Sequence, residues 1–191
     1  METLLVTGFE PFGGMEVNAS WEAASRLPEF VGRWKIECLR LPVVYQQAAE
    51  EMLREIRRVK PEVVICCGVA AGRGGVTPEL VALNYRWARI PDNAGQLFSG
   101  TPILPQGETA LMTSLPVHRM VEAIRAKEIP AWLSLSAGAY VCNDLYYHLL
   151  LNESELGYRG LFVHVPEEKD VNADRAALAL TACIETALET E

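Results

Sequence analysis

The sequence lacks long apolar runs and clusters of basic residues. No stretch approaches the roughly 18 consecutive apolar residues of a membrane span, and residues 1–6 lack the basic leader of a secretion signal. Acidic residues outnumber basic ones 25 to 17, which gives a formal net charge of −8 and leaves no Lys/Arg stripe that would follow phosphates. We therefore expect a cytoplasmic protein that binds neither membranes nor nucleic acid.

Cysteine is sparse as well, at five residues, an odd number that is typical of reduced thiols in a cytoplasm. Cys66 and Cys67 are neighbours in a predicted strand and point to opposite faces, and no His/Asp/Glu spacing completes a metal site around them. The glycine-rich segment 72–75 lacks the Lys-Ser/Thr pair of a phosphate-binding loop. The sequence thus predicts a protein without a metal, a nucleotide or another cofactor.

Short β-branched runs alternate with longer amphipathic stretches. We predict strands over residues 4–7, 36–41, 63–68, 81–85, 133–136 and 161–165. Predicted helices cover residues 45–59 and 116–127, and others begin near Ala19 behind an Asn18 cap, near Val141 and after Asn172. This alternation predicts an α/β fold: a single domain over residues 1–191, with an open, mostly parallel twisted sheet and helices on both faces. The segment 91–116 is the best candidate for a functional loop or an interface arm.

Cys142 is the strongest candidate for a nucleophile. Ligands of open α/β sheets bind beyond the carboxyl ends of the strands, and Cys142 follows the predicted strand 133–136 through small residues that allow a sharp turn into a helix. Unpaired amides and the helix dipole favour a thiolate there, so we expect the thiol pKa to fall from its usual ~8.5 toward neutrality. The same amides suit an oxyanion. The alternative, a buried structural cysteine, is disfavoured by this position.

His164 ends the predicted strand 161–165 and falls at the same edge of the sheet. An otherwise apolar strand gains nothing structural from an imidazole, which favours a general base over a core histidine. His118 opens a surface helix, and His148 lies on a different helical face from Cys142. We interpret these two histidines as solvated or structural.

Other residues near this edge leave alternatives open. A cysteine–histidine pair usually needs a third group to orient the imidazole, and Glu79, Asp92 and Glu10 all compete for that role. The segment 8–14 carries two aromatic residues, Phe9 and Phe12, in a glycine-rich loop. A tight turn that folds both rings into the core and a loop that presents them to a ligand are equally compatible with this pattern.

Five short segments along the chain carry a family resemblance. They read GFEPFGG at residues 8–14, VTPE at 76–79, ARIPDN at 88–93, SAGAYVCN at 136–143 and VHVP at 163–166. Several motifs in a family's order are far more specific than any one of them. Over essentially its whole length the chain resembles the pyroglutamyl peptidase I family, also called pyrrolidone carboxyl peptidases. The resemblance implies a cysteine exopeptidase that releases pyroglutamate from peptide N-termini and needs no cofactor.

The resemblance also implies roles for individual residues. Cys142 would be the nucleophile, His164 the base and Glu79 the orienting acid, which resolves the choice of acid. The other implied site residues are Phe9 and Phe12 beside the pyroglutamyl ring, Ile90, Tyr140 and Val141 in the pocket wall, and Arg89 near the reacting carbonyl. Members of the family form homo-oligomers, often tetramers, so a homo-oligomer is expected here too.

The chain departs from the family pattern at four positions. Where relatives usually read Gly-Gln-Ala-Gly-Gly-Arg, this chain has Val69 in place of Gln and Ala71 in place of a glycine. Val43 and Ala139 stand where hydroxyl residues are common. These changes predict an altered pocket wall. They leave open a different cysteine amidohydrolase on the same scaffold, or a non-catalytic small-molecule binding protein, since the fold also resembles that of purine nucleoside phosphorylases.

Overall fold

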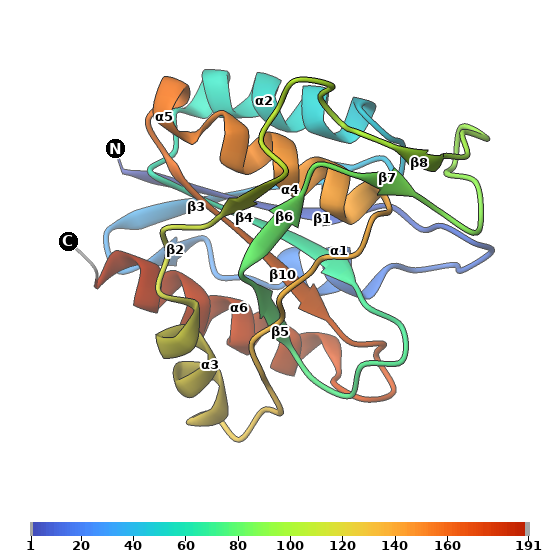
Figure 1. Ribbon diagram of the computed structural model, residues 1–191. Coiled ribbons are helices and arrows are strands. Elements are labelled where there is room, and N and C mark those ends of the chain that lie inside the picture. The colour runs from blue at the N-terminus through green and yellow to red at the C-terminus, as the bar shows by residue number, and fades with distance from the viewer. Residues whose placement is uncertain (1, 190–191) are drawn as a thin grey trace.

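A six-stranded, mostly parallel sheet forms the centre of the molecule (Figure 1). The computed structural model describes residues 2–189. The strands, in sheet order, are β2 (Phe30–Val31), β3 (Trp34–Leu41), β1 (Thr3–Phe9), β4 (Val63–Val69), β10 (Arg159–Val165) and β5 (Thr77–Glu79). The central strands β3, β1, β4 and β10 run parallel, whereas β2 and β5 pair antiparallel at the two edges. The predicted α/β fold is confirmed.

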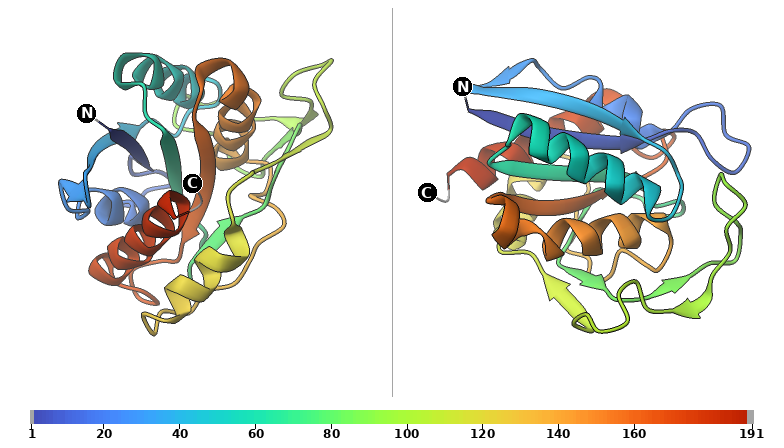
Figure 2. Two further views of the ribbon diagram at one scale, coloured as in Figure 1. Left: turned by 90° about the vertical axis from the view of Figure 1, so that its left-hand side faces the viewer. Right: turned by 90° about the horizontal axis from the view of Figure 1, so that it is seen from above.

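Helices cover both faces of this sheet. They are α1 (Ala19–Ala24), α2 (Gln47–Val59), α3 (Val117–Arg125), α4 (Val141–Leu151), the short α5 (Glu153–Leu156) and α6 (Ala173–Leu188). Helices α1, α3 and α6 pack into one apolar core, and α2 and α4 pack into the other (Figure 2). Because both faces are covered, β1, β4 and β10 are buried almost from end to end, as is usual for parallel strands.

The adjacent cysteines of β4 show how the pleat divides the two cores. Cys66 is buried in the core formed with α2 and α4, and Cys67 in the core formed with α1, α3 and α6. Their opposite orientation, predicted from the strand period, is confirmed. All five cysteines of the chain are free thiols.

Helices α1 and α6 begin directly after the asparagines that were predicted to precede them. The Asn18 side chain accepts a hydrogen bond from the backbone amide of Ser20 at 3.0 Å, and Asn172 accepts one from Arg175 at 2.9 Å. Each side chain satisfies an amide of the first helical turn that has no partner within the helix. Between residues 2 and 189, no helix is both long and apolar enough to cross a lipid bilayer.

The predicted strand over residues 133–136 is wrong. The chain there runs beside β5 and makes only isolated bridges, Val76 with Ala131 and Glu79 with Ser134. Backbone hydrogen bonds do link residues 130–134 to residues 76–80, including the 2.8 Å bond from the Leu80 amide to the Ser134 carbonyl oxygen. The ladder is interrupted at Pro78, which has no amide hydrogen to donate, so only two separate bridges remain.

Residues 81–112 form an arm of two small antiparallel sheets outside the main one. Strand β6 (Val81–Leu83) pairs with β9 (Ala110–Met112), and β7 (Arg86–Trp87) pairs with β8 (Ser99–Thr101). The predicted strand 81–85 corresponds to β6, which is shorter and lies outside the central sheet. The loop between β7 and β8 projects from the body of the molecule (Figure 2), and the arm exposes apolar side chains such as Leu97 and Met112.

Candidate active site

A cavity of about 330 Å³ opens beyond the carboxyl ends of β1, β4 and β10. Its lining comprises Phe9, Phe12, Asn18, Val43, residues 69–71, Arg73, residues 136–138, residues 140–142 and His164. Most of these side chains are apolar, and the polar ones gather around Cys142 and His164. The cavity lies where open α/β sheets bind their ligands.

Cys142 lies in the first turn of α4, in the wall of this cavity. After the left-handed turn at Gly138 the backbone is extended at the N-cap, Tyr140, and the helix begins at Val141. Gly68, near the end of β4, faces the sulfur, because a Cβ atom at Gly68 would lie 2.8 Å from Sγ of Cys142. The missing side chain at Gly68 makes room for the half-buried thiol.

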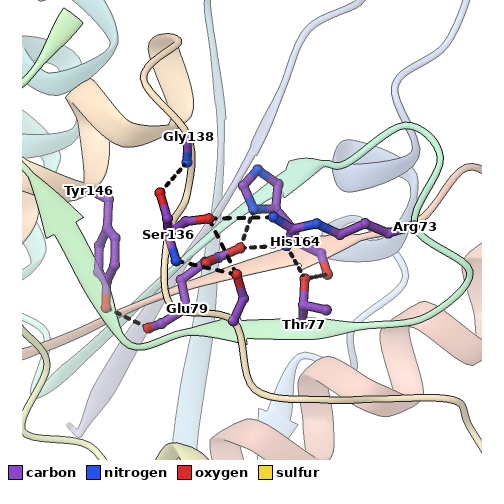
Figure 3. Close-up of polar contacts among 8 residues, drawn as sticks. Arg73, Thr77, Glu79, Ser136, Gly138, Tyr146 and His164 are labelled. Atoms are coloured by element: carbon purple, nitrogen blue, oxygen red, sulfur yellow. Dashed lines mark hydrogen bonds and ion pairs between the residues drawn. The ribbon is translucent and has the colours of Figure 1, made fainter.

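His164 enters the cavity from β10 and is held by Glu79 of β5 (Figure 3). Nδ1 of His164 lies 2.7 Å from Oε1 of Glu79. The antiparallel register pairs His164 with Thr77 and Phe162 with Glu79, so imidazole and carboxylate are diagonal neighbours across the two strands. Both side chains are buried. With Nδ1 engaged by the carboxylate, Nε2 is the ring nitrogen left for proton transfer.

The two competing acids serve other parts of the structure. The Glu10 carboxylate accepts a hydrogen bond from the backbone amide of Val43 at 3.2 Å. Asp92 folds back onto its own loop, where it accepts a hydrogen bond from the backbone amide of Gln96 at 2.8 Å. Of the three acids that the sequence left open, Glu79 is the one hydrogen-bonded to the site histidine.

Burial dominates the proton affinities at the site. It raises the pKa of the Cys142 thiol to about 12, and the charge of Glu79 acts in the same direction. The hydrogen bond from the backbone amide of Cys142 and the positive charge of Arg73 oppose this rise only in part. The predicted fall of the thiol pKa toward neutrality is therefore wrong, because desolvation outweighs the helix N-terminus. Burial also lowers the pKa of His164, which the Glu79 carboxylate raises only in part. The resting site holds a neutral thiol beside a neutral base.

Arg73 is a further member of the site that the sequence analysis did not identify (Figure 3). Its Nη1 atom lies 2.7 Å from Oε1 of Glu79 and 2.6 Å from Oγ1 of Thr77. Its Nη2 atom lies 3.4 Å from the carbonyl oxygen of Ser136. The signal in the sequence was an arginine in the glycine-rich segment 72–75, a few residues before the Thr-Pro-Glu motif.

Aromatic and aliphatic side chains form the remaining wall. Phe9 is buried and belongs to the core as well as to the cavity lining. Phe12 is half-buried, and its ring centroid lies 6.2 Å from that of Tyr140. Val141 lines the cavity beside them. The sequence left open whether the two rings of segment 8–14 pack into the core or face a ligand. Phe9 does both, and Phe12 lines the cavity.

Three of the four departures from the family pattern lie in this wall. Val43, Val69 and Ala71 line the cavity. The fourth, Ala139, contributes its carbonyl oxygen, which accepts a hydrogen bond from the Tyr45 hydroxyl at 3.3 Å. The prediction that the departures alter the pocket wall is consistent with the positions of the first three.

Arg89 and Ile90, which the resemblance assigned to the site, lie outside the cavity lining. Arg89 is exposed, with its guanidinium 5.7 Å from the ring centroid of Trp87, and Ile90 is 49% exposed. The chain turns outward after β7 to form the β7–β8 hairpin, where the Ala88 amide donates to the Phe98 carbonyl oxygen at 2.9 Å. Neither residue is therefore placed against Cys142 by a contact of the described structure.

Together these groups suit one kind of chemistry. A thiol that passes its proton to an oriented imidazole attacks a carbonyl carbon, and backbone amides at a helix start stabilise the oxygen that becomes negative. The amides of Asn143 and Asp144 donate to the Tyr140 carbonyl oxygen, so the amides available for this role are those of Val141 and Cys142. The fold and the site define a cysteine hydrolase built on an open α/β sheet.

Comparisons with known proteins narrow this class. The family described as pyroglutamyl peptidase matches residues 2–190. The pyrrolidone-carboxylate peptidase of Brevibacillus brevis is 40% identical over 190 residues, covering 96% of this chain and 88% of that protein. The pyrrolidone-carboxylate peptidase of Enterococcus faecalis is 41% identical over 178 residues, and the match covers 92% of this chain and 84% of the Enterococcus protein.

Solved structures agree with these sequence matches. The crystal structure of pyroglutamyl peptidase I from Bacillus amyloliquefaciens superposes with a TM-score of 0.92 at 38% identity, covering 98% of this chain and 95% of that one. Pyrrolidone carboxyl peptidase from Pyrococcus furiosus gives a TM-score of 0.92 at 34% identity, covering 98% of each chain. The chain belongs to the pyroglutamyl peptidase family, whose members are cysteine peptidases.

Proposed function

We propose that this protein hydrolyses the amide bond that follows an N-terminal pyroglutamyl residue and releases free pyroglutamate. The observation that carries the proposal is the aromatic-walled cavity that ends at Cys142 and His164, in a chain of this family. Glu79, hydrogen-bonded to Nδ1 of His164, completes the proposed triad.

The cavity wall supports an uncharged, cyclic N-terminal group. Phe9, Phe12 and Tyr140 provide apolar surface for the faces of a lactam ring. An ordinary N-terminus would carry an ammonium group into this wall, and desolvating that charge without a carboxylate partner costs several kcal/mol. The pyroglutamyl ring has no ammonium group, so the wall selects it over other N-terminal residues.

The reaction starts from the neutral pair. His164 removes the proton of Cys142 as the sulfur attacks the pyroglutamyl carbonyl carbon, and the new oxyanion accepts hydrogen bonds from amides at the start of α4. Because the thiol pKa is about 12, attack and proton transfer to the imidazole are coupled. The imidazolium is stabilised by the Glu79 carboxylate, 2.7 Å away.

Two further steps complete the turnover. The imidazolium of His164 gives its proton to the departing amine as the C–N bond breaks, which leaves a thioester on Cys142. A water molecule then attacks the thioester carbonyl while His164 accepts its proton. The C–S bond breaks, the imidazolium returns the proton to the sulfur of Cys142, and free pyroglutamate is released. The resemblance places Arg89 near the reacting carbonyl, and in this structure its guanidinium lies 5.7 Å from the ring centroid of Trp87, outside the cavity lining.

We also propose a reducing, cytoplasmic setting and a homo-oligomer. Five free cysteines support the first. The exposed apolar side chains of the arm, Trp87, Leu97 and Met112, support the second. Light scattering of the reduced protein should give at least twice the 21.1 kDa mass of one chain, and a monomer at micromolar concentration would contradict the homo-oligomer.

The function is tested by the release of a fluorescent amine from pyroglutamyl, leucyl and prolyl amides. Wild-type protein should cleave the pyroglutamyl amide alone, and Cys142→Ala should be inactive, whereas Cys38→Ala, which changes a thiol outside the cavity, should keep full activity. Cleavage of none of the three amides by reduced protein would reject the substrate, and the altered wall at Val69 would then favour a different amidohydrolase. Equal activity in Cys142→Ala would reject the nucleophile.

A further inference from the structure

Arg73 shares one carboxylate oxygen with the histidine of the site. Oε1 of Glu79 lies 2.7 Å from Nη1 of Arg73 and 2.7 Å from Nδ1 of His164. The guanidinium is itself held from two sides, by Oγ1 of Thr77 at 2.6 Å and by the carbonyl oxygen of Ser136 at 3.4 Å. The carboxylate therefore cannot rotate without breaking hydrogen bonds to both partners.

The charges explain why such a contact is needed. The Glu79 side chain is completely buried, and the neutral imidazole beside it does not balance a carboxylate. A buried charge without a partner is costly, whereas a charge-assisted hydrogen bond to arginine compensates it. Arg73 is 29% exposed at its side chain, so the cation keeps contact with solvent while it neutralises the buried anion.

We propose that Arg73 is a positioning residue for the hydrolysis, which fixes the Glu79 carboxylate against His164 and keeps the imidazole neutral between turnovers. This inference rests on the proposed peptidase reaction and adds a supporting residue to the proposed triad of Cys142, His164 and Glu79. Arg73 acts through Glu79, in contrast to the direct contact with the reacting carbonyl that the resemblance assigned to Arg89.

The electrostatic part of the proposal has a definite direction. Besides burial, the groups that act on the pKa values of Glu79, Cys142 and His164 are these three residues themselves, Arg73, the Ser134 hydroxyl near Glu79 and the Cys66 thiol near Cys142. After burial and the opposing effect of Glu79, the Arg73 charge lowers the pKa of His164. The same charge opposes the rise of the Cys142 pKa. Removing it should raise both pKa values.

The test compares Arg73→Met, Arg73→Lys and Arg86→Met. Arg86 is the matched control, because it also forms a buried ion pair, with Nε 2.5 Å from Oδ1 of Asp144, but lies outside the cavity lining. For each protein, kcat and KM for the pyroglutamyl amide are measured from pH 5 to 9, together with the rate at which iodoacetamide alkylates Cys142. Alkylation needs no substrate, so it tests Arg73 even if the proposed function fails.

Arg73→Met is expected to lower kcat roughly 10- to 100-fold, the loss for a charge-assisted hydrogen bond, with KM nearly unchanged. The acidic limb of the kcat–pH profile of this variant should move to higher pH. Alkylation of Cys142 should be slower by about tenfold for each unit by which the thiol pKa rises. Arg73→Lys keeps the charge, so it should restore the wild-type pH profile and part of kcat. Arg86→Met should keep the wild-type profile.

Two results would overturn the proposal. An Arg73→Met protein with the wild-type pH profile and alkylation rate would show that the arginine is only structural, whatever its effect on the melting temperature. If Arg73→Met fails to fold, Arg73→Lys decides alone. In that case, a wild-type kcat would show that the hydrogen-bond geometry at Glu79 does not need arginine.

Discussion

Gly68 lies directly against the sulfur of Cys142: a Cβ atom at Gly68 would lie 2.8 Å from this sulfur and 2.8 Å from Cζ of Phe162. Gly68→Ala must therefore displace the sulfur of Cys142, the ring of Phe162 or both. We expect kcat to fall roughly 100-fold, the usual consequence of misplacing a reacting group by about 1 Å. Gly74→Ala is the matched control, because a Cβ there has no atom within 4 Å. Equal activity in both variants would mean that the thiol reaches its substrate from another position.

Glu79→Gln should have an effect on pH dependence opposite to that of Arg73→Met. The carboxylate raises the pKa of His164 against the larger effect of burial, so its loss should move the acidic limb of kcat/KM to lower pH. At the same time kcat should fall by roughly 10³- to 10⁴-fold, because an amide does not fix the imidazole tautomer or stabilise the imidazolium. Steady-state kinetics from pH 5 to 9 would reveal both effects.

Glu153 provides the control for this prediction. It is also a partly buried carboxyl, and it accepts a hydrogen bond from the amide of Gly160 at 2.6 Å, outside the cavity lining. Glu153→Gln should keep the wild-type pH profile. A Glu79→Gln protein with near wild-type kcat would remove the acid from the proposed triad.

Phe12→Ala should weaken substrate binding more than it slows chemistry. The ring forms part of the cavity wall opposite Tyr140 but touches neither member of the His164–Glu79 pair. Loss of this apolar surface, about 1–3 kcal/mol, should raise KM by roughly 10- to 100-fold. Phe30→Ala, which removes an exposed ring on the edge strand β2, should leave KM unchanged. A lower kcat with constant KM for Phe12→Ala would contradict a binding role.

The free energy of unfolding should decrease as the pH falls below about 6.5, the ordinary histidine pKa. Burial lowers the pKa of both His148 and His164 in the folded protein. Unfolding then binds protons, so acid favours the unfolded chain by about 1.4 kcal/mol for each unit by which the two states differ. Urea unfolding at pH 7.5 and 5.5 measures this loss.

Single histidine substitutions assign the effect. His148→Gln and His164→Gln should each reduce the loss of stability between the two pH values, whereas the exposed His118→Gln should not. Glu153 acts in the opposite sense, because burial raises its pKa to about 6 and its contribution to stability is lost as the pH rises through that value. A stability that is constant from pH 7.5 to 5.5 in all variants would exclude the two histidines as its source.

Strands β1, β4 and β10 could be predicted because they are covered on both faces and read as nearly continuous apolar runs. Strand β5 could not, because it has three residues and contains Pro78, which lacks an amide hydrogen. The stretch 133–136 reads Leu-Ser-Leu-Ser, an alternation that predicts a strand, yet the chain makes only single bridges beside β5. The periodicity of a sequence does not reveal which strand a segment will pair with.

The site residues differ in the same way. His164 could be found because it ends a strand in an otherwise apolar context. Cys142 was placed after a predicted strand that the structure lacks, but the small residues before it correctly indicated the turn into α4. Arg73 could not, since its contact with Glu79 depends on how an irregular loop turns back over β5. Arg89 was assigned by resemblance alone, and it lies outside the cavity lining.

The position of β10 has a consequence for synthesis on the ribosome. This strand is inserted between β4 and β5, although 85 residues separate His164 from Glu79. Until residues 159–165 have emerged, β4 and β5 each lack the neighbour that β10 provides, and Cys142 lacks the base that we propose for it. Under the proposed mechanism, the nascent chain is inactive until this last strand is in place. A peptidase built in this order cannot act on other peptides before its own fold is complete.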